Sequence, residues 1–177
     1  VKPPKCAGCQ LGKQSRRPKK AGTTSVKDPA SEGALKQGKL NPGDLVFTDQ
    51  YESPLLGRQF SARGNDVSSQ KFRGGTIFCD AASGKLSVYH QVGLTATETI
   101  QSMLQFEKEA ATAGITIKAY SSDNGIYTSK EFLKEVSSKG QGLQCSGVGA
   151  HHQNDVAEVN IKITVRTART MMIYAAL

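Results

Sequence analysis

The sequence lacks the features that define several large protein classes. It has no run of about 18 consecutive apolar residues, so we expect no membrane-spanning helix. It has no secretory signal peptide, and we expect the protein not to be secreted. It also lacks a Ser, His and Asp order of a hydrolase triad, a glycine-rich phosphate loop and a His-Glu-x-x-His pair. Any chemistry must therefore rest on other residues.

Cysteine is scarce, and the four cysteines fall into two kinds. Cys6 and Cys9 form a Cys-x-x-Cys pair in a tract rich in Lys and Pro, with no His before it. Such a pair is half of a tetrahedral zinc site, so we expect no tight zinc binding by residues 1–177 alone. A disulfide between the two is the alternative for a secreted protein. Cys79 and Cys145 lie in strand-like runs, where cysteine usually acts as a small buried apolar residue.

Positive charge is in excess, with 23 Lys and Arg against 15 Asp and Glu and a formal net charge of +8. This excess favours a polyanionic partner, and nucleic acid fits best because Lys and Arg displace the counterions of phosphates. A basic domain with no such partner remains the alternative. The length of 177 residues allows one domain with a core, together with a tail.

The first part of the chain reads as a tail. Residues 13–43 combine Gly, Ser, Thr, Pro and Lys, a composition that buries little apolar surface and predicts a basic flexible linker. Its basic run could contact DNA phosphates, act as a nuclear-import signal or simply be solvated. The chain begins at Val1 and stops at Leu177 within a helical pattern, so we expect a piece of a longer polyprotein. The basic run named above consists of Lys13, Arg16, Arg17, Lys19 and Lys20.

The ordered part should begin near Asp44 and alternate strands with helices. Thr95 with Glu98, and Thr128 with Glu131, fit capping boxes that open two helices, and Gly114 should end the first. In the second helix Phe132, Leu133 and Val136 should point inward. Residues 53–73 are too long for a tight hairpin and predict a mobile loop. Strands are predicted at 44–51, 75–81, 86–92, 115–121 and 143–145, with a third helix from about residue 154.

Three acidic residues stand out by their local setting. Asp49 closes an apolar strand-like run, and Asp123 follows another and precedes the turn signal Asn-Gly. Glu158 lies near the start of the last helix. Hard cations such as Mg²⁺ bind carboxylate oxygens together with substrate phosphates. Strand ends and a helix that meet at one sheet edge would form such a site. Asp80 also ends a strand run, and we interpret it as a turn residue.

The last helix has two stripes. An apolar stripe at three- and four-residue steps predicts a core face. On another face Glu158 is followed by Lys162, Arg166 and Arg169 at steps of four, four and three. These cations could follow a phosphate backbone, and the alternative is an i,i+4 Glu–Lys pair on a solvated face. The apolar stripe consists of Ala157, Ile161, Thr164, Ala168, Met172 and Ala175.

The sequence around the acids resembles one protein family. Ser-Asp-Asn-Gly at 122–125 and His-Gln-Asn-Asp-Val-Ala-Glu at 152–158 are similar to the second and third acidic motifs of retroelement integrases. Phe-Thr-Asp-Gln at 47–50, the run 74–80 and Ala-Arg-Thr-Met-Met at 168–172 resemble the copia class of LTR retrotransposons, with diatom copia-like elements nearest. The resemblance runs from about residue 6 to residue 177.

The resemblance implies an α/β ribonuclease H-like fold, a mixed five-stranded sheet with helices on both faces. It identifies Asp49, Asp123 and Glu158 as the catalytic acids that hold two Mg²⁺ or Mn²⁺ ions. The implied activity is that of a DDE polynucleotidyl transferase, which processes cDNA 3′ ends and inserts the cDNA into host DNA. Gln153, Asn154, Lys162, Arg166 and Arg169 become candidate DNA contacts.

The family also implies a wider organisation, that of a Gag-Pol polyprotein. Residues 1–12 would end an N-terminal HHCC-type domain, in which an upstream His pair completes a zinc site with Cys6 and Cys9. Residues 44–177 would be the catalytic core, truncated at its C-terminus. The partners would be element cDNA ends, host target DNA and further copies of the chain. The implied location is a cytoplasmic particle before integration and the nucleus at the site of action.

Two positions depart from the family's pattern. Asp155 stands where the family has Gly, adding a carboxylate near Glu158 and, as we expect, some backbone strain. Val159 stands where the family has Arg, which removes a DNA contact. We expect the fold to persist and full activity to be impaired. The alternatives are a ribonuclease H-superfamily nuclease and a non-catalytic nucleic-acid-binding remnant.

Overall fold

The computed structural model describes residues 6–7, 12, 40–59, 71–146 and 155–176. Contacts divide the chain into two units, each described here by itself. The larger unit is Gln37–Asn160, and it contains the sheet. The smaller unit combines Val1–Lys36 with Ile161–Leu177, which includes most of the last helix.

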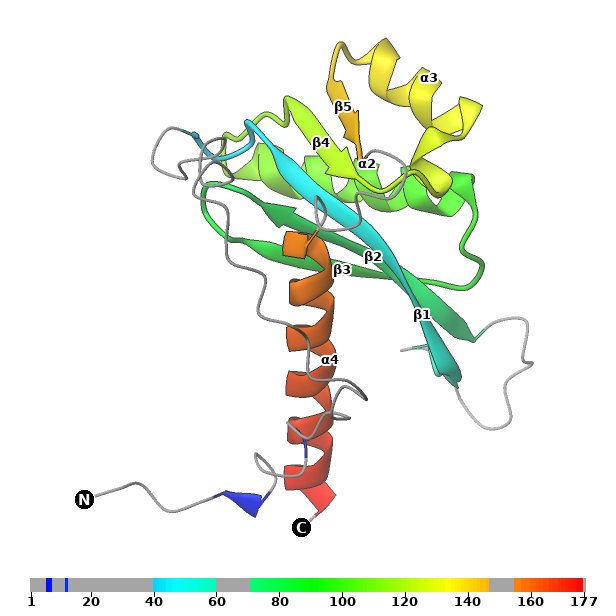
Figure 1. Ribbon diagram of the computed structural model, residues 1–177, viewed down its shortest axis with the longest axis vertical. Coiled ribbons are helices and arrows are strands. Elements are labelled where there is room, and N and C mark those ends of the chain that lie inside the picture. The colour runs from blue at the N-terminus through cyan, green and yellow to red at the C-terminus, as the bar shows by residue number, and fades with distance from the viewer. Residues whose placement is uncertain (1–5, 8–11, 13–39, 60–70, 147–154, 177) are drawn as a thin grey trace, which may run out of the picture. The chain divides into compact units, whose positions relative to one another are not determined.

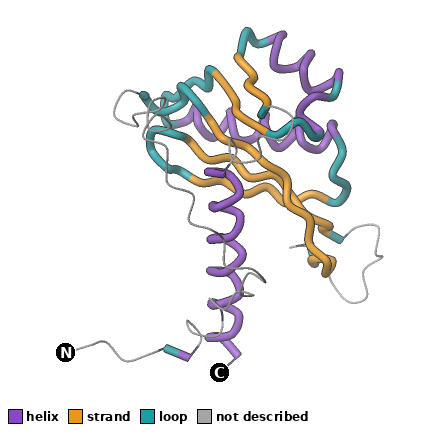
Figure 2. The backbone as a smooth tube through the Cα atoms, in the orientation of Figure 1, coloured by secondary structure: helices purple, strands orange, loops and turns teal. Residues whose placement is uncertain are grey.

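The larger unit is built on one five-stranded sheet in the order β3-β2-β1-β4-β5 (Figures 1 and 2). β1 is antiparallel to β2, and β2 to β3, whereas β4 is parallel to both β1 and β5. This mixed sheet is the one expected of the ribonuclease H-like fold, and that prediction is confirmed. The strands are β1 (Val46–Gly57), β2 (Phe72–Asp80), β3 (Leu86–Gln91), β4 (Ala119–Ser122) and β5 (Gly142–Cys145).

Helices cover both faces of this sheet. α2 (Ala96–Thr112) and α3 (Lys130–Ser138) pack on one face, where Phe78 of β2 stacks on Phe106 of α2 at a centroid distance of 4.9 Å. Successive strand residues alternate in direction, so Cys79 faces the other side. There the Asn160 amide, in the first turns of α4 (Asp155–Ala176), donates to Cys79 Sγ at 3.2 Å. The main core lies on the α2 and α3 face and includes Val46, Met103, Tyr120, Tyr127, Phe132 and Val136.

α2 begins and ends as the sequence predicts. Thr95 is the N-cap and accepts a hydrogen bond from the Glu98 N–H at 3.3 Å. The Glu98 carboxylate accepts from the Gly93 N–H at 2.9 Å, two residues before the N-cap, rather than from the Thr95 N–H as in a standard capping box. Gly114 has a φ of +73°, the left-handed conformation that glycine adopts at low cost after a helix.

The start of α3 differs from the prediction by one residue. Its N-cap is Ser129, which accepts from the Phe132 N–H at 3.3 Å, so the box from Thr128 to Glu131 does not form. Thr128 instead ends a short 3₁₀ helix, η4 (Ile126–Thr128), and its hydroxyl donates to the Asn124 carbonyl at 2.6 Å. In this helix Phe132 and Val136 are buried as predicted, whereas Leu133 is 43% exposed rather than inward.

Two strand boundaries also differ. β1 continues to Gly57 and pairs there with Phe72, so the two ends of the predicted loop at 53–73 form a two-stranded ribbon, whereas its middle, 60–70, lies outside the described residues. The ribbon carries mostly exposed side chains and therefore lacks the apolar alternation of a buried strand. β4 begins at Ala119 rather than at 115. Ile117 is already buried in the core, although it precedes the strand.

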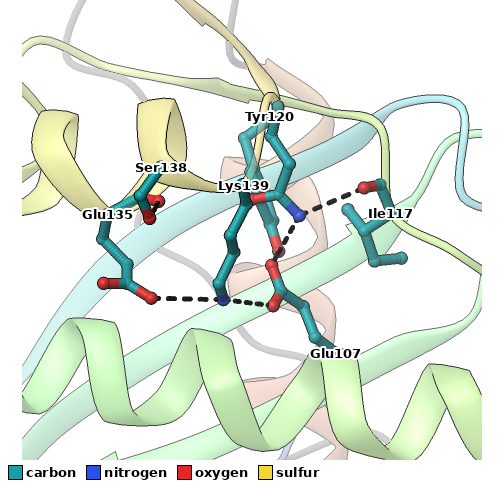
Figure 3. Close-up of polar contacts among 7 residues, drawn as sticks. Glu107, Ile117, Tyr120, Glu135, Ser138 and Lys139 are labelled. Carbon is teal, nitrogen blue, oxygen red and sulfur yellow. Dashed lines mark hydrogen bonds and ion pairs between the residues drawn. The ribbon is translucent and has the colours of Figure 1, made fainter.

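A polar network anchors the segment before β4 (Figure 3). Glu107 of α2 accepts from the Tyr120 hydroxyl at 2.8 Å and from Gln141 Nε2 at 2.7 Å, and it pairs with Lys139. Gln141 also donates to the Ile117 carbonyl at 3.1 Å. These contacts connect α2 and the end of α3 to β4. They thereby stabilise the position of β4 beside β1.

Within the smaller unit, α4 is mostly exposed. The predicted core stripe holds at Ala157, which is buried in the larger unit, but Ala168, Met172 and Ala175 of the smaller unit are exposed. Helical spacing predicts which residues share a face, whereas burial requires a second element against that face. In the part of the chain that the structure describes, no helix is long and apolar enough to cross a membrane.

Candidate active site

The central strand and its parallel neighbour bring two of the acids together. β1 and β4 run parallel, and the last pair in their register is Phe47 with Ser121. Two residues further on, the chains reach Asp49 and Asp123. Both acids therefore lie at the point where the two strands separate, although Asp49 is inside the longer β1 rather than at its end. Parallel strands place their carboxyl ends at one edge of a sheet, where sites commonly form.

Asp123 begins a tight turn after β4. Its Oδ1 accepts a hydrogen bond from the Gly125 N–H at 3.2 Å, the local bond by which an Asp stabilises a turn. The Asn124 amide donates to the Ser146 carbonyl at 2.6 Å, which connects this turn to the end of β5. The Asn-Gly signal thus forms the turn that we expected. Its side-chain contacts hold the loop after β4 at the sheet edge.

Glu158 reaches the same region from α4. Asp49 is paired with Ile77 of β2, and Cys79 lies two residues along β2 on the same face. The hydrogen bond from Asn160 to Cys79 holds the first turns of α4 over this face. Ala157 is fully buried, so this end of the helix packs tightly. The neighbouring Glu158 is half-buried.

The Asp49 carboxyl is influenced by the negative charges of both other acids. The pKa of the Asp49 carboxyl is raised from its usual value of 3.8 to about 6, chiefly by burial, then by the negative charge of Asp123 and to a smaller extent by that of Glu158. A hydrogen bond from the Gln50 N–H to Asp49 Oδ1, at 2.8 Å, acts in the opposite direction. The structure thus gathers acidic groups where ionisation is costly without a cation.

This donor set fits a hard divalent cation in its chemistry. Three carboxylates with solvent access are the oxygen ligands that Mg²⁺ or Mn²⁺ prefers, and a cation would relieve their mutual repulsion. The three carboxylates are less closely spaced than the ligands of an assembled metal site. Among the described residues, no three His, Cys, Asp or Glu side chains lie close enough to hold one metal ion together. A bound cation would therefore have to draw the carboxylates together.

Asp80 is separate from this cluster, as we expected. Its Oδ1 accepts from the Gly43 N–H at 2.8 Å, and its Oδ2 accepts from the N–H and hydroxyl of Ser83 at 2.7 and 2.6 Å. The bonds to Oδ2 stabilise the turn between β2 and β3, and the bond to Oδ1 connects this turn to the segment before β1. Asp80 is thus a turn residue.

The structure describes some of the other predicted site residues and not the rest. Lys162, Arg166 and Arg169 are exposed along α4 in the smaller unit. Gln153, Asn154 and Cys9 lie outside the described residues, so their predicted roles stay predictions. Cys6 is half-buried, and Cys79 is buried as expected. Cys145 is exposed, contrary to the expectation, because β5 is an edge strand.

Two contacts beside the acids were not predicted. Thr48, directly before Asp49, shares a hydrogen bond of 3.0 Å with the Tyr127 hydroxyl, and Asn160 contacts Cys79. Each contact joins residues about 80 positions apart in the sequence. The only local signal was that Thr48 is a polar residue inside an apolar run, which indicates a buried partner without naming it.

Comparison with solved structures finds similar folds in viral integrases. A chain in the intasome of simian T-cell lymphotropic virus, solved with the PP2A regulatory subunit B56 gamma, gives a TM-score of 0.50 at 19% identity. It matches 67% of this chain and 37% of its own length. The HTLV-2 integrase catalytic core, solved with magnesium, gives 0.44 at 21% identity, over 60% of this chain and 62% of the other.

The catalytic core of BIV integrase gives a TM-score of 0.45 at 16% identity, over 66% of this chain and 62% of that one. The chain thus spans less than two thirds of each of these three proteins. Comparison with protein-family models and with curated protein sequences finds no match. At these identities the likeness to the intasome chain concerns the fold, which is ribonuclease H-like.

Proposed function

We propose that this chain carries the catalytic core of an integrase from a copia-class LTR retrotransposon. In this proposal Asp49, Asp123 and Glu158 are the acids of a DDE polynucleotidyl transferase. The observation that carries the proposal is the electrostatic coupling of Asp49 to both other acids. Structural ion pairs also perturb pKa values, but a raised carboxyl pKa beside two further acids on a sheet edge is typical of a functional site.

The reaction would be phosphodiester exchange on DNA. In 3′-end processing, a water oxygen forms the new bond to phosphorus while the bond to the leaving 3′ oxygen breaks. In strand transfer, the 3′-hydroxyl of the cDNA is the attacking group and a target strand supplies the leaving oxygen. Two Mg²⁺ or Mn²⁺ ions, when bound, supply charge that stabilises the attacking and leaving oxygens in line. The three carboxylates would hold these ions, and Asp49 would ionise fully as it does so.

DNA binding would use the basic surface of the chain. Lys162, Arg166 and Arg169 are exposed and recur at helical spacing after Glu158, and the net charge of +8 favours association with phosphates. Gln153 and Asn154 complete the proposed contacts. The proposal includes element cDNA ends and host target DNA as partners, self-association in the active complex and action in the nucleus. It also includes the predicted organisation of the chain, in which residues 1–12 end an HHCC-type domain, 13–43 are a basic linker and 44–177 are the catalytic core.

The two departures from the family pattern bear on activity in different ways. Asp155 is the first residue of α4, and no non-glycine residue in the described part of the chain has a positive φ. The backbone strain that we expected at Asp155 is therefore not present. Val159 is 48% exposed, where an Arg could reach DNA. The loss of that contact favours a second candidate, a nucleic-acid-binding remnant without catalysis.

A strand-transfer assay with Mn²⁺ separates the two candidates. We expect the protein with its upstream segment to join a cDNA-end oligonucleotide to plasmid DNA, and Asp155→Gly to join it faster because one carboxylate beside Glu158 is removed. Asp123→Asn is the matched control, since it removes a proposed metal ligand and should abolish joining. DNA binding without any joining, in both the wild type and Asp155→Gly, would identify the remnant. Cleavage without joining would identify a nuclease.

A further inference from the structure

A buried tyrosine hydroxyl lies beneath the acid cluster. Tyr127 is 1% exposed and shares a 3.0 Å hydrogen bond with the hydroxyl of Thr48, which is 0% exposed. The Tyr127 ring contacts Phe132 of α3 edge-on, with the centroids 5.2 Å apart. The hydroxyl is thus held by a packed ring on one side and by the central strand on the other. Such a bond, away from water, has little freedom in its geometry.

This bond connects the two segments that carry the first two acids. Thr48 directly precedes Asp49 on β1, and Tyr127 follows Asp123 by four residues. Tyr127 lies in η4, where the Thr128 hydroxyl donates to the Asn124 carbonyl at 2.6 Å, and the Tyr127 hydroxyl adds the contact of this turn with β1. Burial raises the pKa of Tyr127, and the charges of Asp49 and Asp123 add to this effect. Both carboxylates therefore lie near the hydroxyl.

We propose that Tyr127 is a positioning residue, which acts through Thr48 to set the spacing of the Asp49 and Asp123 carboxylates for a divalent cation. The acids do not lie close enough to bind an ion without moving. Their affinity for a divalent cation therefore depends on how firmly their backbones are held. Groups that orient metal ligands without touching the metal typically change affinity by about 10- to 100-fold when removed. This inference rests on the proposed metal-binding function of the acids.

The test measures Mn²⁺ affinity of the metal-free full chain by titration calorimetry. We expect Tyr127→Phe, which removes only the hydroxyl, to weaken Mn²⁺ binding by about 10- to 100-fold. Thr48→Val should weaken it by a similar factor, and the double variant should bind no more weakly than either single one. Thr48→Ser keeps a hydroxyl and should retain affinity.

Tyr120→Phe is the matched control. Tyr120 is also fully buried in the same core, and its hydroxyl donates to Glu107 at 2.8 Å, in a network separate from the Tyr127–Thr48 bond (Figure 3). We expect this variant to lose stability without losing Mn²⁺ affinity. An equal loss of affinity in Tyr120→Phe would overturn the inference, because it would reflect general loosening of the core.

The outcomes separate this inference from the proposed function. If Tyr127→Phe binds Mn²⁺ as tightly as the wild type does, the positioning role is overturned and the integrase proposal is left intact. Mn²⁺ binding by the wild type without DNA joining overturns the integrase proposal, and the positioning role is still decided by the affinities. Wild-type protein that binds no Mn²⁺ overturns both. If Tyr127→Phe fails to fold, the comparison of Thr48→Val with Thr48→Ser decides the question.

Discussion

Replacing Asp49 by Asn should stabilise the protein in the absence of divalent metal. Asn keeps the oxygen that accepts the Gln50 N–H but removes the charge that burial and the neighbouring acids disfavour. The shift of the Asp49 pKa from 3.8 to about 6 is worth about 3 kcal/mol at 1.36 kcal/mol per pKa unit. Asp49 is partly exposed and solvent screens its charge, so we expect a gain of about 1–2 kcal/mol at pH 7.

The gain must depend on pH with a definite sign. The folded pKa of Asp49 is above the unfolded one, so the folded state retains the proton longer as pH rises. The wild type is therefore at no disadvantage below pH 3.8, loses stability between about pH 4 and 6, and reaches a plateau above that. The advantage of Asp49→Asn should be small at pH 4 and complete at pH 7.

Urea unfolding in EDTA at pH 4, 5.5 and 7 measures this free-energy difference. Asp80→Asn is the control, because an amide nitrogen cannot accept the two hydrogen bonds from Ser83, and it should destabilise the protein by about 1–3 kcal/mol at pH 7. Saturating Mg²⁺ at pH 7 should then stabilise the wild type and not Asp49→Asn. A gain for Asp49→Asn that is absent at pH 7, or equal at pH 4 and 7, would refute the reasoning.

Two further predictions concern the basic helix and the cysteine pair. Replacing Lys162, Arg166 and Arg169 by Ala should reduce the slope of log DNA affinity against log salt by about 2.7, because each phosphate contact contributes about 0.9; an unchanged slope would mean that the stripe is only solvated. Residues 1–177 should retain no zinc at Cys6 and Cys9 after dialysis against a weak chelator, whereas a chain with the upstream segment should retain one equivalent. Stoichiometric zinc in the shorter chain would contradict this.

The order of strands and helices could be derived from local signals. Apolar alternation, the cap at Thr95 and the glycine after α2 are properties of a few neighbouring residues, and each was read correctly. Errors arose where a competing turn contact or the packing around an element decided the outcome. Ser129 rather than Thr128 caps α3 because the Thr128 hydroxyl donates to the Asn124 carbonyl in the preceding turn. Leu133 is exposed although Phe132 and Val136 of the same helix are buried. The ribbon at the end of β1 was missed because it buries little apolar surface.

The site shows the same division between local sequence and tertiary structure. The sequence by itself determined that Asp49 and Asp123 follow apolar strand-like runs and that Glu158 lies in an amphipathic helix, because each pattern is local. Only the tertiary structure decided that the parallel register of β1 and β4 brings the first two acids level, and that burial and the charge of Asp123 raise the pKa of Asp49. It also decided which buried hydroxyl lies beneath them, because Thr48 and Tyr127 are 79 residues apart and meet only when the sheet forms.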